Sequence, residues 1–177
     1  MGYCTQLCDP PIVCNQMDTQ LVEMLGRHRL IAELLRANLE VATPARDRGI
    51  DLIAYADLGT QVTRFSACPI QLKAAIDGSF SVDRKYEKFP NLLMAYVWYL
   101  EDPAKTVTYA TTYSEAIAVA DAMGYTQTPS WEKGLYVTTR PSPHLVAQLE
   151  PFRMTAEKWW EKVTSSRELP SEPPADR

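Results

Sequence analysis

The chain has 177 residues, the length of one globular domain, of which 46% are hydrophobic and 23% charged. Its 18 basic and 22 acidic residues give a net charge of −4, which excludes bulk positive charge as the means of holding nucleic acid but leaves room for a local basic site. No stretch approaches the roughly 18 consecutive apolar residues of a membrane span, and the first residues lack the pattern of a signal peptide. We therefore expect a cytoplasmic protein without membrane contact.

The cysteines do not form a recognisable chemical motif. They are Cys4, Cys8, Cys14 and Cys68. Their spacing lacks the paired C-x2-C steps of a zinc site, and neither a C-x-x-C nor a nearby activating base supports a thiol enzyme. The regular pattern starts at Met17, so residues 1–16 are expected to be a flexible appendage and 17–165 a single domain. Residues 166–177 are rich in Pro, Ser and charge and predict a disordered tail.

The first predicted element is a helix that Asp18 or Thr19 caps and that runs to about Asn38. Apolar residues recur along it at helical spacing, which predicts an arc facing the core. This arc comprises Leu21, Met24, Leu25, His28, Ile31, Ala32 and Leu35. His28 is therefore interpreted as a core histidine and not as a catalytic base. A short segment at 39–43 and a turn at 44–49 follow.

The middle of the chain predicts a run of strands, and helices follow near its end. The first two strands are joined by a polar hairpin around Gly59. The expected strands are residues 50–56, 65–74, 79–82, 91–100, 106–110 and 134–138. The expected later helices are residues 112–123, 144–149 and 155–163. This order predicts an α/β fold with a mixed sheet flanked by helices and a small C-terminal helical cap.

Two charged residues interrupt these apolar strands. Asp51 falls within Gly-Ile-Asp-Leu-Ile, and Lys73 falls within Ile-Gln-Leu-Lys-Ala. Because strand side chains alternate, Gln71 and Lys73 share one face, and register pairing would bring Asp51 beside them. A buried unpaired carboxylate costs several kcal/mol, so the two charges are best explained together. An ordinary Asp–Lys ion pair or a solvent-facing position for both side chains is the structural alternative.

The stretch from the first helix to Lys73 resembles the PD-(D/E)xK nuclease superfamily, particularly restriction-endonuclease-like and Holliday-junction-resolvase-like members. The shared order is a helix, a short strand, a strand bearing Asp, a hairpin, and a strand bearing an acid or Gln two residues before Lys. Here these steps read Gly49-Ile50-Asp51 and Gln71-Leu72-Lys73, and the resemblance covers about residues 18–100. It implies a restriction-endonuclease-like fold, and members of this superfamily commonly form homodimers.

The resemblance also implies a metal-dependent endonuclease that hydrolyses DNA phosphodiester bonds. Asp51 and Gln71 would bind Mg²⁺, with Mn²⁺ also accommodated, and Lys73 would orient the water and neutralise the phosphate. An amide in place of the more usual carboxylate at position 71 should weaken Mg²⁺ binding.

Related sequences supply a further carboxylate from the first helix. Alignment of Ala32-Glu33-Leu34-Leu35 with the end of that helix puts Arg27 where this Glu would stand. Glu33 is the chosen third ligand because it lies within the matched segment, and Glu23 is the alternative. A solvated helix carboxylate is the simpler interpretation of either residue, and Arg27 could instead contact a phosphate.

A second function class stays open. From Arg64 to Lys88 the local charge is +2 in an otherwise acidic chain, which is compatible with a phosphate track or with a solvated loop. Gln71, Arg27 and the net charge favour a catalytically weakened nuclease fold that binds nucleic acid or a protein. The two charges inside apolar strands favour the endonuclease instead.

Overall fold

The computed structural model describes residues 18–46, 48–56, 59 and 65–165. The expected appendage at 1–16, the expected tail at 166–177 and most of the loop around Gly59 therefore lie outside the described residues. In the described part, no helix combines the length and the apolar character that a membrane span requires.

Helices and strands follow the predicted order closely. The longer helices are α1 (Thr19–Arg36), α2 (Tyr113–Ala122), α4 (Pro143–Leu149) and α5 (Ala156–Thr164), with a single turn at α3 (Pro129–Glu132). The strands are β1 (Leu39–Ala42), β2 (Leu52–Ala56), β3 (Ala67–Ala74), β4 (Phe80–Asp83), β5 (Leu93–Trp98), β6 (Val107–Thr112) and β7 (Leu135–Thr138). Short 3-10 turns lie at η1 (Arg84–Tyr86), η2 (Tyr125–Gln127) and η3 (Glu150–Phe152).

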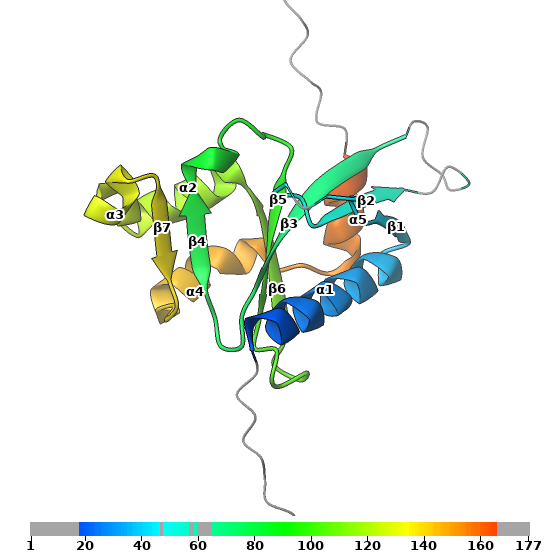
Figure 1. The fold of residues 1–177 in the computed structure, drawn as a ribbon, viewed down its shortest axis with the longest axis horizontal. Coiled ribbons are helices and arrows are strands. Elements are labelled where there is room, and N and C mark those ends of the chain that lie inside the picture. Colours follow the sequence, from blue (N-terminus) through cyan, green and yellow to red (C-terminus); the bar gives the residue numbers. More distant parts are fainter. Residues whose placement is uncertain (1–17, 47, 57–58, 60–64, 166–177) are drawn as a thin grey trace, which may run out of the picture.

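Five of the strands form a mixed sheet in the order β1-β2-β3-β5-β6. Strands β3 and β5 are parallel, and the other neighbours are antiparallel. Strands β4 and β7 leave this sheet and pair with each other. In Figure 1, α1 and α5 lie on one side of the large sheet, and α2, α4 and the β4–β7 pair lie on the other. The expected α/β fold with a mixed sheet flanked by helices is thus confirmed.

Each face of the sheet has its own apolar core, because alternate residues of β5 point to opposite sides. Leu93, Ala95 and Val97 pack with α1 and α5, and Met94, Tyr96 and Trp98 pack with α2, α4 and β4. All six residues of β5 are buried. A strand that lies between two packed layers is buried on both faces in this way.

The core-facing side of α1 differs from the prediction. Its buried residues are Val22, Gly26, Leu30 and Leu34. Most of the predicted arc is exposed, and so is His28, so its interpretation as a core histidine is wrong. Gly26 explains the difference, because a Cβ built on it would lie 2.6 Å from the Cβ of Ala74. The helix packs on β3 through its smallest residue. Because glycine has no side chain, a pattern of apolar side chains does not reveal this contact.

We expect Gly26→Ala to destabilise the protein even though alanine favours helices by about 1 kcal/mol over glycine. The added methyl group meets Ala74, a short side chain that cannot swing aside. Overpacking of this kind costs about 1–3 kcal/mol. Chemical denaturation should show a lower free energy of unfolding, and Ala74→Gly should recover part of it in the Gly26→Ala background. A more stable Gly26→Ala protein would contradict this close helix–strand contact.

Candidate functional site

Strand pairing brings the predicted site residues onto one face of the sheet. Asp51 directly precedes β2, and its backbone N–H donates to the carbonyl of Ile70 on β3 at 2.9 Å. This bond continues the β2–β3 register by one residue, so Asp51 lies beside Gln71. Leu72 belongs to the core under α1 and α5, and strand alternation puts Gln71 and Lys73 on the opposite face. The expected convergence of Asp51 and Gln71 is present.

The Asp51 carboxylate is buried and hydrogen-bonded. Only 6% of the residue is exposed, which rules out the solvent-facing alternative for Asp51. Its Oδ2 accepts from the Leu72 backbone N–H at 2.6 Å and from Gln71 Nε2 at 2.5 Å. These bonds offset part of the several kcal/mol that burial of a carboxylate would otherwise cost.

Arg27 of α1 brings a cation to the same carboxylate. Its Nη2 lies 3.6 Å from Asp51 Oδ1, and its Nη1 donates to the Asp51 carbonyl at 3.3 Å. Nη2 also pairs with Glu23 at 2.9 Å. The contacts therefore put the Arg27 guanidinium beside Asp51, and they connect Glu23 to Asp51 through this guanidinium.

Glu33, the third ligand chosen from the sequence, is engaged elsewhere. It pairs with Arg29 at 2.7 Å, accepts from the Thr108 hydroxyl at 3.0 Å and accepts from Trp159 Nε1 at 3.4 Å. These contacts join α1 to β6 and α5. The described contacts of Glu33 thus lie within the packing of the sheet and do not include Asp51 or Gln71.

Lys73 carries its charge in an unfavourable setting. Burial is the main cause that lowers the pKa of its ammonium group, and the positive charge of Lys85 lowers this pKa further. Asp51 and Asp83 oppose these effects. The carboxylate of Asp51 is therefore close enough to Lys73 to act on its protonation.

Tyr86 is a site residue that the sequence did not reveal. Its hydroxyl donates to Gln71 Oε1 at 3.2 Å, and Lys73 Nζ lies 5.6 Å from its ring centroid. Tyr86 is thus in contact with both members of the Gln-x-Lys pair. It comes from η1, in the basic segment that the sequence marked only by its charge.

The oxygen atoms of the site fit a hard divalent cation, with one carboxylate as the charged donor. Gln71 Nε2 lies 2.5 Å from Asp51 Oδ2 and donates to the Leu72 carbonyl at 3.3 Å, so it occupies a position between two oxygens. Turning this amide over would present its oxygen there instead, and the Tyr86 hydroxyl can then accept from the NH₂ group. Carboxylate, amide and carbonyl oxygens are suitable Mg²⁺ donors. In the described residues, no three His, Cys, Asp or Glu side chains are grouped to hold a metal, so the fit depends on Gln71.

A basic pocket of about 240 Å³ adjoins Gln71. Gly49 lines it, and a Cβ built on this residue would lie 3.7 Å from Gln71 Oε1 and 3.8 Å from the Tyr86 ring. The other lining residues are Arg48, Ile50, Lys85, Tyr86, Lys88, Phe89 and Leu92. Its three cations and apolar walls can take a phosphate group together with an apolar or aromatic group.

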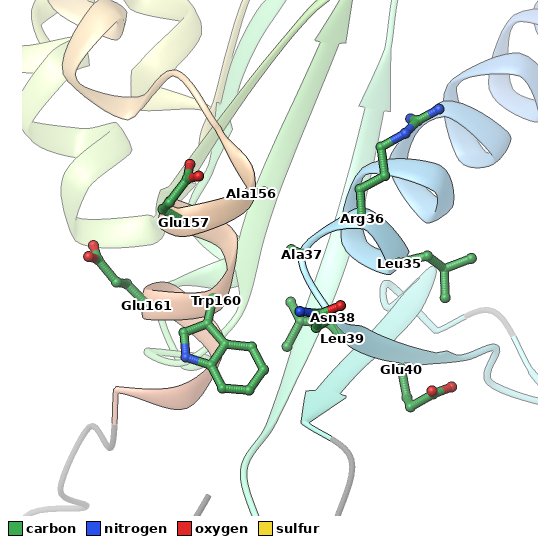
Figure 2. Close-up of a pocket in the computed structure, with 10 residues that line it drawn as sticks. All are labelled: Leu35, Arg36, Ala37, Asn38, Leu39, Glu40, Ala156, Glu157, Trp160 and Glu161. Atoms are coloured by element: carbon green, nitrogen blue, oxygen red, sulfur yellow. The ribbon is translucent and has the colours of Figure 1, made fainter. Parts of the chain in front are cut away.

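A larger pocket of about 870 Å³ has the opposite charge. It lies between the C-terminal end of α1, the start of β1 and α5, as Figure 2 shows. Trp160 forms one wall, and Glu40, Glu157 and Glu161 outnumber Arg36 among the charged lining residues. This charge disfavours a phosphate backbone, so the pocket beside Gln71 is the better candidate for a polyanionic ligand.

We expect Lys73→Met to stabilise the protein at neutral pH, because it removes a partly buried charge. The folded state lowers the pKa of Lys73, so the unfolded state binds more protons and stability should rise with pH between the two pKa values. The melting temperature of Lys73→Met should therefore exceed that of the wild type near pH 7, and the gap should narrow as pH rises toward 10.5. Lys105→Met is the control, since Lys105 is exposed. A lower melting temperature for Lys73→Met would contradict this account and indicate a structural ion pair.

Comparisons of the chain with protein-family profiles, curated proteins and solved structures found no match.

Proposed function

We propose that this protein is a metal-dependent endonuclease that hydrolyses DNA phosphodiester bonds on a restriction-endonuclease-like fold. The observation that carries the proposal is the buried Asp51 carboxylate, held against the Gln71 amide on the face that Lys73 shares. Such an arrangement is costly for folding alone, because a carboxylate and an ammonium both lose water there. Residues that disfavour stability and converge in one place are typical of a functional site.

The order of elements supports the proposed fold. Helix α1, strand β1, the strand that Asp51 precedes and the strand bearing Gln71 and Lys73 follow one another in the order of the superfamily. Strand β5 then lies parallel to β3, the central strand of the sheet, on the side away from β2. The ends of β2 and β3 thereby hold the reactive groups on regular backbone.

Each residue has a distinct role in the proposed reaction. Asp51, the Gln71 amide oxygen and the Leu72 carbonyl would hold the cation, and Tyr86 would fix the orientation of the amide through its hydroxyl. A bound Mg²⁺ supplies Lewis-acid stabilisation of phosphate charge and a more acidic water. Lys73 would contact the scissile phosphate or the attacking water, and its lowered pKa helps it to accept or pass on a proton.

The pocket beside Gln71 suits the flanking nucleotides. Arg48, Lys85 and Lys88 can neutralise phosphates, and Phe89 offers an exposed ring for a base. Lys88 already lies over this ring, with 5.3 Å between its Nζ and the ring centroid. These contacts are local, which fits DNA binding by a chain whose net charge is −4.

We expect Asp51→Asn and Lys73→Ala each to reduce DNA cleavage at least about 100-fold. Asp51 would hold the metal, and Lys73 would stabilise the negative charge that develops on the phosphate in the transition state. Plasmid and single-stranded DNA are incubated with Mg²⁺ or Mn²⁺. Asp102→Asn and Lys105→Ala are matched controls, since these residues form an ion pair of 3.1 Å at the surface. If Asp51→Asn fails to fold, the cleavage rate of Lys73→Ala alone tests the proposed site. Wild-type rates in a folded Lys73→Ala protein would refute the site.

A nuclease fold that has lost or weakened catalysis, and that binds nucleic acid or a protein, is the second candidate. The observation that favours it is the Arg27 guanidinium 3.6 Å from Asp51 Oδ1. This cation competes with a metal for the single carboxylate of the site, and the alignment would have a third carboxylate there. Metal affinity separates the two candidates, because a binding scaffold has no need for a metal.

We expect the wild type to bind Mn²⁺ weakly and Gln71→Glu to bind it about tenfold more tightly, because a second carboxylate adds charge to the site. Arg27→Gln should also strengthen binding by removing the competing cation. Isothermal titration calorimetry in the absence of DNA measures both effects. Glu33→Gln is the control and should leave Mn²⁺ affinity unchanged, given its contacts with Thr108 and Trp159.

Two results of this titration would count against the proposed site. Weaker binding by Glu33→Gln would return Glu33 to the ligand set. No Mn²⁺ binding by the wild type or by Gln71→Glu would favour the binding scaffold.

A further inference from the structure

The pocket beside Gln71 is small, and apolar side chains form most of its walls. These are Ile50, Tyr86, Phe89 and Leu92, around a volume of about 240 Å³. Pockets for drug-sized ligands measure about 300–1,000 Å³, so this pocket fits a smaller group. A single nucleobase is such a group, whereas a base pair is too large. The volume of the pocket therefore suits one base at a time.

Gly49 connects this pocket to the candidate site. Its φ of 89° lies in the left-handed region, which favours glycine. A Cβ built on it would lie 3.7 Å from Gln71 Oε1 and 3.8 Å from the Tyr86 ring, and so would occupy the space between these side chains. Glycine thus leaves the pocket open toward Gln71. Because the Tyr86 hydroxyl donates to Gln71 Oε1 at 3.2 Å, a group in the pocket lies next to the proposed metal ligands.

The two aromatic rings of the pocket each have an ammonium group nearby. Lys85 Nζ lies 4.9 Å from the centroid of the Tyr86 ring, and Lys88 Nζ lies 5.3 Å from that of Phe89. Phe89 is 45% exposed and Leu92 only 3%, so Phe89 lies at the mouth of the pocket and Leu92 at its floor. A base that stacks on Phe89 therefore has a cation within reach of its own phosphate.

We propose that the pocket beside Gln71 takes one unpaired nucleobase of DNA, so that the strand to be cleaved is single-stranded next to the scissile phosphate. This proposal rests on the proposed function and narrows its substrate. A base inside a duplex is stacked on both faces and paired along one edge. It can enter a pocket for one base only after unstacking and unpairing, at a cost in free energy. A base in a single strand avoids most of this cost.

The charge around the pocket also favours a single strand over a duplex. The lining cations are Arg48, Lys85 and Lys88, and Lys85 is partly compensated by Asp83 at 3.1 Å. Strongly salt-dependent binding to duplex DNA involves about 6–10 phosphate contacts, more than these three residues supply. Stacking of a base on an aromatic ring adds affinity without further phosphate contacts. A short unpaired segment is therefore the ligand that suits both the rings and the few cations.

Fluorescence anisotropy in the presence of EDTA measures DNA binding separately from metal binding and cleavage. The full chain is titrated into a labelled single strand of about 12 nucleotides, or into the same sequence as a blunt duplex. We expect the single strand to bind at least about tenfold more tightly, because its bases are free to stack. Equal or tighter binding of the duplex, or no binding of the single strand, would overturn the proposal.

A strand of abasic nucleotides tests whether a base enters the pocket. Phe89→Ala should weaken binding of the intact single strand at least about fivefold and leave binding of the abasic strand unchanged, because only the base can stack. Phe65→Ala is the matched control, since Phe65 is also exposed, at 57%, and lies outside the described lining of the pocket. Lys88→Gln should weaken binding of both strands alike, through a phosphate. An equal effect of Phe89→Ala on the two strands would overturn the base contact.

The base pocket and the endonuclease can fail separately. A protein that binds single strands through Phe89 but cleaves no DNA with Mg²⁺ or Mn²⁺ would leave the base pocket in place and refute the endonuclease. A protein that cleaves duplex DNA, and whose Phe89→Ala variant cleaves single strands at the wild-type rate, would leave the endonuclease in place and refute the base pocket. Circular dichroism confirms in each case that the variant is folded.

Discussion

The carboxylate of Asp51 links the three elements around the candidate site. Its Oδ2 is hydrogen-bonded to Leu72 and Gln71 of β3, and its Oδ1 and carbonyl face Arg27 of α1. An acid that is 6% exposed cannot keep its charge without such partners. The burial of this one carboxylate is therefore compensated jointly. Strand pairing supplies the hydrogen bonds from β3, and the placement of the first helix supplies the positive charge of Arg27.

The close approach of α1 to the sheet makes the contact between Arg27 and Asp51 possible. Gly26 leaves room for Ala74, and the next residue, Arg27, then lies within reach of Asp51. The same rotation of the helix directs Glu33 toward Thr108 and Trp159. It also turns Leu21, Met24 and Leu25 to the solvent. One small residue thus determines both which charge meets Asp51 and which face of α1 is exposed.

The sequence predicts the strand-borne part of the site well because its information there is local. Alternation along β3 puts Gln71 and Lys73 on one face, and the antiparallel pairing of neighbouring strands β2 and β3 brings Asp51 beside Gln71. The face of α1 is not predictable in this way, since Gly26 contributes no apolar side chain to the pattern although it forms the tightest contact. Tyr86 is also beyond local reasoning, because its contact with Gln71 depends on how the segment between β4 and β5 folds back over the sheet. The pairing of β4 with β7 joins segments far apart in the chain and has no local signal either.

The charge balance of the site connects its two candidate functions. Asp51 and Glu23 contribute two negative charges, and Arg27 and Lys73 contribute two positive charges, while Lys85 is partly compensated by Asp83 at 3.1 Å. The charges around Asp51 therefore balance, which weakens a metal site that has a single carboxylate, and the positive charge that attracts a phosphate lies in the adjoining pocket with Arg48, Lys85 and Lys88. Under the proposed function, a phosphodiester would bring the missing negative charge, since its oxygens can join Asp51 and Gln71 as donors to a hard cation. The metal would then bind the protein–DNA complex more tightly than the free protein. By linkage, DNA would bind the protein–metal complex more tightly by the same factor. A scaffold that binds DNA without a metal needs only the basic pocket. The coupling between the two ligands, and not DNA binding alone, is therefore the property that distinguishes an enzyme from a scaffold.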